Sequence, residues 1–377
     1  MLASLSVLLL SYHFSLPSGP AIVLVAGLAY ALSLVFGPAG GLAARACRAA
    51  ISKPERRFHA HPQSASDIRH RGPRPGARRS GDRAVRQTDP VVAAFSILGD
   101  MVKRIGGEHV AVTTLVGPDG DTHVYRPTPA DARAVSEAKI LVVNGLQFEG
   151  WLDRLIDASD FRGVRVVATD GIEPIAFEEG GHDDHAGHAG HAGHEGHGHD
   201  HGAFDPHAWQ SVRNATVYAH NIAVALAKAD PAKAGAFDRN RAAYLDRLEA
   251  LDAEIDRIVA KLPAGRRTVV TSHDAFQYFG RRYGLTFIAP QGLSTESEAS
   301  AKDVARLVRQ IRAEGIRAVF VENITDSRLL TRIAEETGAR IGGTLYPGAL
   351  SGPDGPAPTY LDMMRHNAKT IAKALAP

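Results

Sequence analysis

From residue 90 onward, short apolar runs rich in β-branched residues alternate with longer amphipathic stretches. A strand of a parallel sheet reads as a continuous apolar run, because helices cover both faces of such a sheet. We expect strands at 91–97, 109–116, 139–144, 164–168, 268–271, 285–289, 318–321 and 340–345. We expect helices near 98–106, 211–229, 275–283, 301–314, 327–337 and 359–375. This alternation is typical of α/β proteins with parallel sheets.

One long helix is predicted between these two groups of strands. Pro231 suits a first helical turn, and apolar residues then recur every three or four positions at Tyr244, Leu248, Leu251, Ile255, Ile258 and Leu262. At 1.5 Å per residue, a helix of about 30 residues is about 45 Å long. Such a helix could run along two domains as a stiff strut, although an ordinary long surface helix has the same periodicity.

The predicted architecture is two parallel-sheet α/β lobes joined by one long rigid helix. A chain of 377 residues is long enough for two domains of ordinary size, and an apolar content of 44% suits a globular core. A hydrophobic N-terminal helix and a disordered linker precede the lobes. The expected parts are a hydrophobic segment at 1–44, a basic linker at 45–89, an N-terminal lobe at 90–229, the linking helix at 230–262 and a C-terminal lobe at 263–377.

The N-terminal segment is apolar and has no Asp, Glu, Lys or Arg before Arg45. The run 21–36 spans a bilayer if it extends to Ala44, and we therefore expect a transmembrane helix in 1–44. A signal peptide is the alternative, although the segment lacks a basic start. The Arg-, Pro-, Gly- and Ser-rich stretch 45–89 is typical of a disordered linker.

The formal net charge of +2 conceals an asymmetry between the two ends of the chain. Residues 1–89 carry 12 Lys and Arg against 4 Asp and Glu, whereas the remaining residues carry 31 against 37. Nucleic-acid binding requires a concentrated basic surface, so the acidic body argues against nucleic acid as a partner. With Cys47 as its single cysteine, the chain can form no internal disulfide.

Three isolated histidines stand in short, turn-rich contexts: His123 in DTHVYRPTP, His207 in DPHAW and His273 in TSHDAFQYFG. His123 and His273 each follow a predicted strand, and ligands of open parallel sheets bind beyond the carboxyl ends of the strands. A single histidine in such a place is usually structural. Three of them suit Zn²⁺, with one oxygen ligand in addition. We expect Asp205 to accept a hydrogen bond beside this site.

Residues 181–202 form a low-complexity tract that cannot build a packed core. We expect its histidines to capture Zn²⁺ with modest affinity before the metal reaches His207, since tethering keeps captured metal close to the site. An expanded repeat with incidental metal affinity is the alternative. The histidines of the tract are His182, His185, His188, His191, His194, His197, His199 and His201.

Six segments between about residues 90 and 376 resemble the metal-binding solute receptors of ABC importers for zinc and manganese. They are FSILGDMV (95–102), GPDGDTHVYRPTP (117–129), FDPHAW (204–209), TSHDAFQYFGRRYGL (271–285), STESEAS (294–300) and GPDGPAPTYLDMMRHN (352–367). The resemblance implies two lobes joined by a rigid helix, with metal ligands at His123, His207 and His273. It also implies a mobile histidine-rich loop of the kind found in zinc-specific members, here at 178–203.

The same resemblance bears on which metal is bound. Manganese members tend to carry Glu at the position of His273, so a third imidazole favours zinc as the transported ligand over manganese. Many members place a ligating Asp in a segment resembling LY-x-D-S-L, and this chain has LYPGAL (345–350) with Gly348 at that position. Water, Asp354, Glu298 or a tract histidine are the alternatives for the fourth ligand.

A receptor of this family implies a membrane permease as partner and a periplasmic or extracytoplasmic location, with membrane association through 1–44. A metallochaperone is a further candidate partner. Residues 8–41 themselves resemble the last membrane helix of the cognate permease, so the start of the chain is a fusion, an anchor or an artefact of gene calling. The arginines after Ala44 conflict with an extracytoplasmic body, because the positive-inside rule would keep them in the cytoplasm.

Two other functions are compatible with the histidines. Three imidazoles and a water also describe a zinc-dependent hydrolase, although the sequence has no HExxH, G-x-S-x-G, GxGxxG or Walker motif. A zinc buffer or adhesin acting through the tract is the other alternative. The sequence favours a non-enzymatic zinc receptor.

Overall fold

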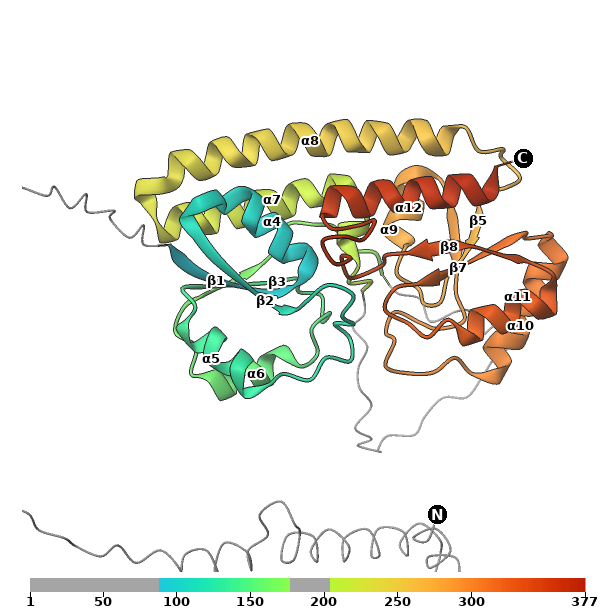
Figure 1. The fold of residues 1–377 in the computed structure, drawn as a ribbon, viewed down its shortest axis with the longest axis horizontal. Coiled ribbons are helices and arrows are strands. Elements are labelled where there is room, and N and C mark those ends of the chain that lie inside the picture. Colours follow the sequence, from blue (N-terminus) through green and yellow to red (C-terminus); the bar gives the residue numbers. More distant parts are fainter. Residues whose placement is uncertain (1–87, 177–203, 377) are drawn as a thin grey trace, which may run out of the picture. The chain divides into compact units, whose positions relative to one another are not determined.

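A computed structural model describes residues 88–176 and 204–376, all within one compact unit of the chain. It consists of two α/β lobes with parallel sheets, which confirms the predicted fold class (Figure 1). The predicted hydrophobic segment 1–44, almost all of the linker 45–89 and the histidine tract lie outside the described residues. Among the described residues, no helix is both long enough and apolar enough to cross a membrane.

The N-terminal lobe is built on four parallel strands in the order β2-β1-β3-β4. Its strands are β1 (Asp89–Phe95), β2 (Val110–Val116), β3 (Ile140–Val143) and β4 (Val164–Val167). Its helices are α4 (Ser96–Gly106), α5 (Pro129–Glu137), α6 (Leu152–Ser159) and α7 (Val212–Ala229), with 3-10 turns η1 (Gly107–His109) and η2 (Ala208–Gln210).

The C-terminal lobe repeats this arrangement, with four parallel strands in the order β6-β5-β7-β8. Its strands are β5 (Thr268–Val270), β6 (Thr286–Ile288), β7 (Ala318–Glu322) and β8 (Arg340–Leu345). Its helices are α9 (Gln277–Tyr283), α10 (Ala301–Glu314), α11 (Arg328–Thr337) and α12 (Tyr360–Leu375). In both lobes the first strand lies between the next two strands along the chain.

The long helix α8 (Ala234–Ala260) connects the lobes, after the 3-10 turn η3 (Pro231–Lys233). Its 27 residues make it about 40 Å long, and it packs on α4 and α7 of the first lobe and on α9 and α12 of the second (Figure 1). Tyr244, Leu248, Leu251 and Ile255 form its buried stripe. The predicted strut is therefore present, and it shares its apolar face between the two lobes.

A single apolar core runs through both lobes and α8. It contains Phe95 and Leu98 from the first lobe, Leu251 from α8, and Phe276 and Met364 from the second lobe, all buried. A second, smaller core lies between the sheet of the C-terminal lobe and helices α10 and α11. Because burial of apolar surface is the main force that stabilises a fold, the continuous core holds the two lobes together.

Most element boundaries differ from the predicted ones by one or a few residues, and three differences stand out. Strand β1 begins at Asp89, inside the predicted linker. Helix α6 was not expected from the sequence, because its segment is short and lies among glycines and aromatic residues. Helix α9 begins at Gln277, two residues after the predicted start at Ala275, because the chain first passes through a turn in which Ala275 N–H donates to the carbonyl of His273.

We predict that Leu248→Ala destabilises the protein by about 2–5 kcal/mol, the usual cost of removing a large buried aliphatic side chain. Leu248 is fully buried under α8. The matched control is Glu249→Ala on the exposed face of the same helix, which we expect to change the free energy of unfolding by no more than about 0.5 kcal/mol. Equal effects of the two substitutions in urea unfolding would show that α8 does not anchor the core.

Candidate metal centre

The three predicted histidines lie at the carboxyl ends of the two sheets. His123 lies in the loop after β2, His207 directly precedes η2, and His273 follows β5. Since β1 and β5 are each flanked by the next two strands, each sheet has a switch point of the kind beyond which ligands bind. The fold thus brings one histidine of the C-terminal lobe to two of the N-terminal lobe.

The three imidazole rings face one another at close range. One ligating nitrogen from each ring lies within 4.8 Å of those from the other two. The Nε2 atoms of His123 and His207 are 3.3 Å apart, and the ring centroids are 5.4–5.7 Å apart. His207 and His273 are fully buried, and His123 is half-buried. Buried imidazoles held this close together form a candidate metal centre.

Asp205 orients the ring of His207. Its Oδ1 atom lies 2.8 Å from Nδ1 of His207 and accepts a hydrogen bond of 2.9 Å from the His207 backbone N–H. The expected contact of Asp205 is therefore present. With Nδ1 engaged by the carboxyl group, Nε2 of His207 is left to face the other two rings.

Glu322 does the same for His273. This buried carboxylate, the last residue of β7, lies 2.6 Å from His273 Nδ1 through Oε2. Its Oε1 atom accepts hydrogen bonds from the backbone N–H groups of Ser272 and His273. The Nε2 atom of His273 is buried and makes no hydrogen bond within the described residues. This nitrogen faces the centre of the cluster, where it is available to a ligand.

The loop that carries His123 is hydrogen-bonded to the opposite lobe. Asp121 accepts from the backbone N–H of His123 and from the hydroxyl of Thr295, at 2.9 and 2.6 Å. Asp119 accepts from the side-chain amide of Asn323 at 2.9 Å, and its own N–H donates to the carbonyl of Leu350. The position of His123 therefore depends on contacts with the C-terminal lobe.

Burial and neighbouring charge act differently on the two buried rings. Burial, followed by the charge of His273, lowers the pKa of His207 well below its usual value. Burial also opposes the charged form of His273, but the Glu322 carboxylate outweighs it and the pKa of His273 is raised. A raised pKa favours the protonated ring, and a proton on His273 competes with a metal for the ring nitrogen, so metal binding is expected to weaken as the pH falls.

The carboxyl groups around the rings respond to the same burial. Burial raises the pKa of Asp205 to about 7, although the His207 N–H opposes the shift, and it raises the pKa of Asp121 and Asp274 as well. A divalent cation at the rings would favour the ionised form of each group. These carboxyl groups would therefore become more negatively charged when a cation binds to the imidazoles.

Aromatic side chains wall the centre on one side. The ring of Phe148 lies 4.8 Å from that of His123 and 4.7 Å from that of Trp209, measured between centroids. Trp209 donates its indole N–H to the carbonyl of Pro347, which fixes the LYPGAL segment beside the wall. A Cβ atom at Gly348 would lie 3.8 Å from both Phe148 and Trp209, an ordinary contact distance.

Two of the predicted alternatives for a fourth ligand do not join the histidines. Asp354 lies in an exposed loop and Glu298 is exposed at the edge of a separate cavity. Among the described residues, the group of potential ligands at this centre consists of the three histidines. The remaining predicted alternatives are water and the tract histidines, the latter outside the described residues.

A cavity of about 480 Å³ lies beside His123, and Pro206, directly before His207, also lines it. Its rim includes Gly145, Leu146 and Gln147, which have φ values of 90°, 52° and 60°. Two consecutive non-glycine residues in the left-handed region store strain of the kind found at functional sites. Behind this rim, buried Glu149 accepts hydrogen bonds from the backbone N–H groups of Asn144 and Gly145.

Sequence analysis missed Glu322, Asp121 and Glu149. A signal for Glu322 exists in the sequence, since an acidic residue ends the apolar run AVFVE and a carboxylate at the carboxyl end of a buried strand needs a partner. Asp121 lies two residues before His123 and matches the spacing of Asp205 and His207. Glu149 has no comparable signal, because its partners are backbone N–H groups.

Comparison with known proteins gives consistent matches over the same part of the chain. Residues 91–374 match the family model described as zinc-uptake complex component A, periplasmic (ZnuA). The chain is 32% identical to the iron-binding protein YfeA of Yersinia pestis, over 75% of this chain and 85% of that protein. It is 33% identical to the manganese-binding lipoprotein MntA of Halalkalibacterium halodurans, over 76% and 88%.

Solved structures agree with these matches. The periplasmic zinc-binding protein TroA of Treponema pallidum is 29% identical, with a TM-score of 0.69, and the match covers 77% of this chain and all of that one. A Mn-bound periplasmic metal-binding protein of Candidatus Liberibacter asiaticus is 31% identical, with a TM-score of 0.65, over 76% of this chain and all of that one. The names of these relatives include iron, manganese and zinc.

We predict that Glu322→Gln weakens metal binding roughly 10- to 100-fold, because the loss of the carboxylate behind His273 lowers the basicity of the ring and loosens its orientation. Co²⁺ is a suitable probe, since its absorption spectrum reports the ligands around it. Glu314→Gln, an exposed position at the opposite end of the C-terminal sheet, is the control. An affinity within about twofold of wild type would contradict the role assigned to Glu322.

We predict that Glu149 makes stability depend on pH. Burial raises its pKa to about 7 from an ordinary value of 4.5, although the N–H of Asn144 opposes the shift. The folded protein therefore binds this proton more tightly than the unfolded chain does. The contribution of Glu149 to stability is complete below pH 4.5 and is lost as the pH rises through 7.

Glu149→Gln should remove this dependence. We expect the difference in free energy of unfolding between wild type and variant to change by up to about 3 kcal/mol between pH 4.5 and 8, at about 1.4 kcal/mol per pKa unit. Urea unfolding at a series of pH values measures it, with exposed Glu173→Gln as the control. A constant difference across that range would mean that Glu149 has an ordinary pKa.

Proposed function

The chain belongs to the family of the periplasmic zinc-uptake complex component A, as its six segments predict, and from this premise we propose that its cargo is Zn²⁺, bound by His123, His207 and His273. The family consists of metal-binding receptors of ABC importers, not of enzymes. A receptor must bind its ion and release it intact, so chemical change of a substrate is no part of its task.

The chemistry of the donor set supports zinc. Three imidazole nitrogens are borderline-soft ligands that suit Zn²⁺, whereas Mn²⁺ favours carboxylate and carbonyl oxygen. At this centre the carboxylates of Asp205 and Glu322 lie behind the rings, hydrogen-bonded to Nδ1 atoms. The nitrogens that face the centre are thus the candidate ligands. The carboxylates do not bind the ion directly but supply negative charge behind the rings.

The spacing of the rings also supports a single bound ion. Nitrogens bound to one tetrahedral Zn²⁺ at about 2.0–2.1 Å are about 3.3 Å apart. His123 and His207 already have this spacing, and all three ligating nitrogens lie within 4.8 Å of one another. An approach of His273 by roughly 1–2 Å would complete a three-nitrogen site. This convergence of rings from two lobes is the observation that carries the proposal.

We extend the proposal to the steps before and after binding. The tract histidines capture zinc and pass it to the centre, and the loaded receptor delivers it to a membrane permease outside the cytoplasm. Residues 1–44 tether the receptor to the membrane. The fourth coordination position is filled by water, because Gly348 supplies no side chain at the place where LY-x-D-S-L relatives have Asp.

Zinc titration of the full chain and three variants tests the proposal. We expect wild type to bind one Zn²⁺ tightly and several weakly. The His123→Ala, His207→Ala, His273→Ala triple variant should lose the tight site, and deletion of 182–201 should remove only the weak ones. Gly348→Asp should tighten binding by roughly 10-fold or more, because a carboxylate completes the ligand set at a position with room for a side chain.

Two outcomes would overturn the proposal. A tight site that survives in the triple variant, but not after deletion of the tract, would move the main site to the tract. Competition with Mn²⁺ tests the choice of metal. Equal affinity for Mn²⁺ and Zn²⁺ at the tight site would leave the receptor function intact and refute the preference for zinc.

A further inference from the structure

A cavity lies at the end of the C-terminal sheet opposite the histidines. It has a volume of about 820 Å³. Its walls include the first residues of β5 and β8, Thr268 and Arg340, and Arg317 directly before β7. The histidine centre lies at the carboxyl ends of these strands, so the two places are separated by the length of the sheet.

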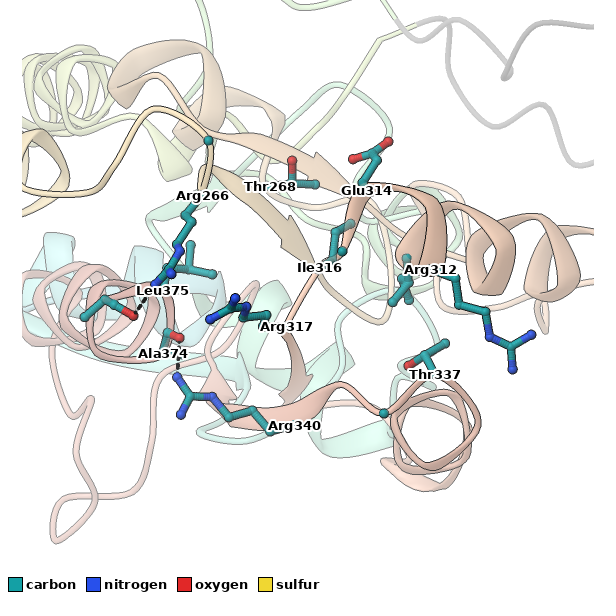
Figure 2. A pocket seen from close by; sticks show the side chains of 15 residues that line it. Arg266, Thr268, Arg312, Glu314, Ile316, Arg317, Thr337, Arg340, Ala374 and Leu375 are labelled. Atoms are coloured by element: carbon teal, nitrogen blue, oxygen red, sulfur yellow. Dashed lines mark hydrogen bonds between the residues drawn. The ribbon is translucent and has the colours of Figure 1, made fainter.

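Four arginines line this cavity within an otherwise acidic body: Arg266, Arg312, Arg317 and Arg340. Figure 2 shows the guanidinium groups of Arg266, Arg317 and Arg340 directed toward the end of α12, while Arg312 points away. Glu314 is the acidic residue in the lining. Arg312, Arg317 and Arg340 are exposed. Like charges repel at close range, so negative charge nearby stabilises such a gathering of guanidinium groups.

The ends of helices account for part of this arrangement. Helices α10, α11 and α12 all end at the cavity, and their carbonyl groups attract cations. Arg266 donates to the carbonyl of Ala376 at 3.0 Å and Arg340 to that of Ala374 at 2.5 Å. Arg312 donates to the carbonyl of Glu336 at 2.6 Å. Capping of helix ends thus explains three of the four arginines.

Capping does not explain Arg317. Its side chain makes no hydrogen bond and no ion pair within the described residues, yet it lines the cavity between Arg266 and Arg340 (Figure 2). Each guanidinium group has five N–H donors, and Arg266 and Arg340 use one nitrogen each on α12. The carbonyls therefore hold these two groups in place while most of their donors remain available.

The charge balance leaves the cavity positive. Arg312 forms an ion pair with the carboxylate of Glu336 at 3.9 Å, so these two charges cancel. Three helix ends contribute roughly −0.5 each, and Glu314 contributes a full negative charge, against the three remaining arginines. An excess of about half a positive charge remains on this count. Guanidinium forks match the oxygens of phosphate in a bidentate manner, and a volume of this size is ordinary for a small-molecule site.

We propose that this cavity binds a small phosphate-bearing molecule, with Arg266, Arg317 and Arg340 donating hydrogen bonds to its phosphate oxygens. The ligand class is a phosphate, because its oxygens can accept hydrogen bonds from three guanidinium groups at once. Arg317 is the residue on which recognition depends, since it has no other partner among the described residues. The site is independent of the metal centre and of the proposed cargo.

Titration of the full chain with inorganic pyrophosphate by calorimetry tests this site. The protein is first freed of metal, because pyrophosphate binds divalent ions itself. We expect Arg317→Gln to weaken binding roughly 10- to 100-fold, the usual effect of losing a charged hydrogen-bond donor. Compared with Arg317→Gln, Arg317→Lys should recover part of the affinity, because lysine keeps the positive charge but lacks the two-pronged guanidinium group.

Arg312→Gln is the matched control. Arg312 belongs to the same lining but is directed at Glu336, so its loss should change the affinity by no more than about twofold.

Two further titrations test the ligand class and the independence of the cavity from the histidines. Citrate, a polycarboxylate of similar charge, should bind more weakly than pyrophosphate; equal or tighter citrate binding would overturn the phosphate class. The triple histidine variant should bind pyrophosphate as wild type does, which shows that the metal centre plays no part. Absence of measurable pyrophosphate binding, or equal binding by wild type and Arg317→Gln, would refute the proposal.

Discussion

Two buried carboxylates determine how this protein presents its imidazoles. Glu322 and Asp205 each engage the Nδ1 atom of a fully buried histidine and, with the same side chain, the adjacent backbone N–H. Each ring is thereby fixed in position and in orientation, with Nε2 directed inward. Burial of an unpaired imidazole or carboxylate would be costly, so the pairs stabilise each other in a place where neither group would otherwise lie.

The rest of the fold serves to keep these pairs in register across two lobes. His207 and Asp205 belong to one lobe and His273 and Glu322 to the other, so their spacing depends on how the lobes are joined. Helix α8 packs on both, and the apolar core passes through it without interruption. The hydrogen bond from Thr295 to Asp121 adds a direct link beside His123. The hydrogen bonds at the centre and the packing of the lobes on α8 therefore both determine the distances between the three histidine rings.

Much of this was predictable from sequence, and the exceptions have a common cause. Apolar runs gave the eight strands, the periodicity of Tyr244 to Leu262 gave α8, and rigid local contexts gave His123, His207 and His273. Glu322, Asp121 and Glu149 were missed because their partners are distant in sequence or are backbone N–H groups. Asp354 and Glu298 were plausible as oxygen ligands by residue type, but the fold leaves both exposed. Residue type indicates which chemistry a side chain is capable of, and three-dimensional proximity decides whether it is used.

The uninterrupted core also bears on how the arrival of an ion is signalled. Receptors whose domains are joined by flexible strands close around the ligand by a hinge motion, so their bound and unbound conformations differ greatly. Here helix α8 packs against both lobes. Bending between the lobes would expose side chains that are now buried, such as Leu251. A transporter facing this molecule must then distinguish full from empty by slight displacements of surface loops, such as the one bearing Asp119 and Asp121.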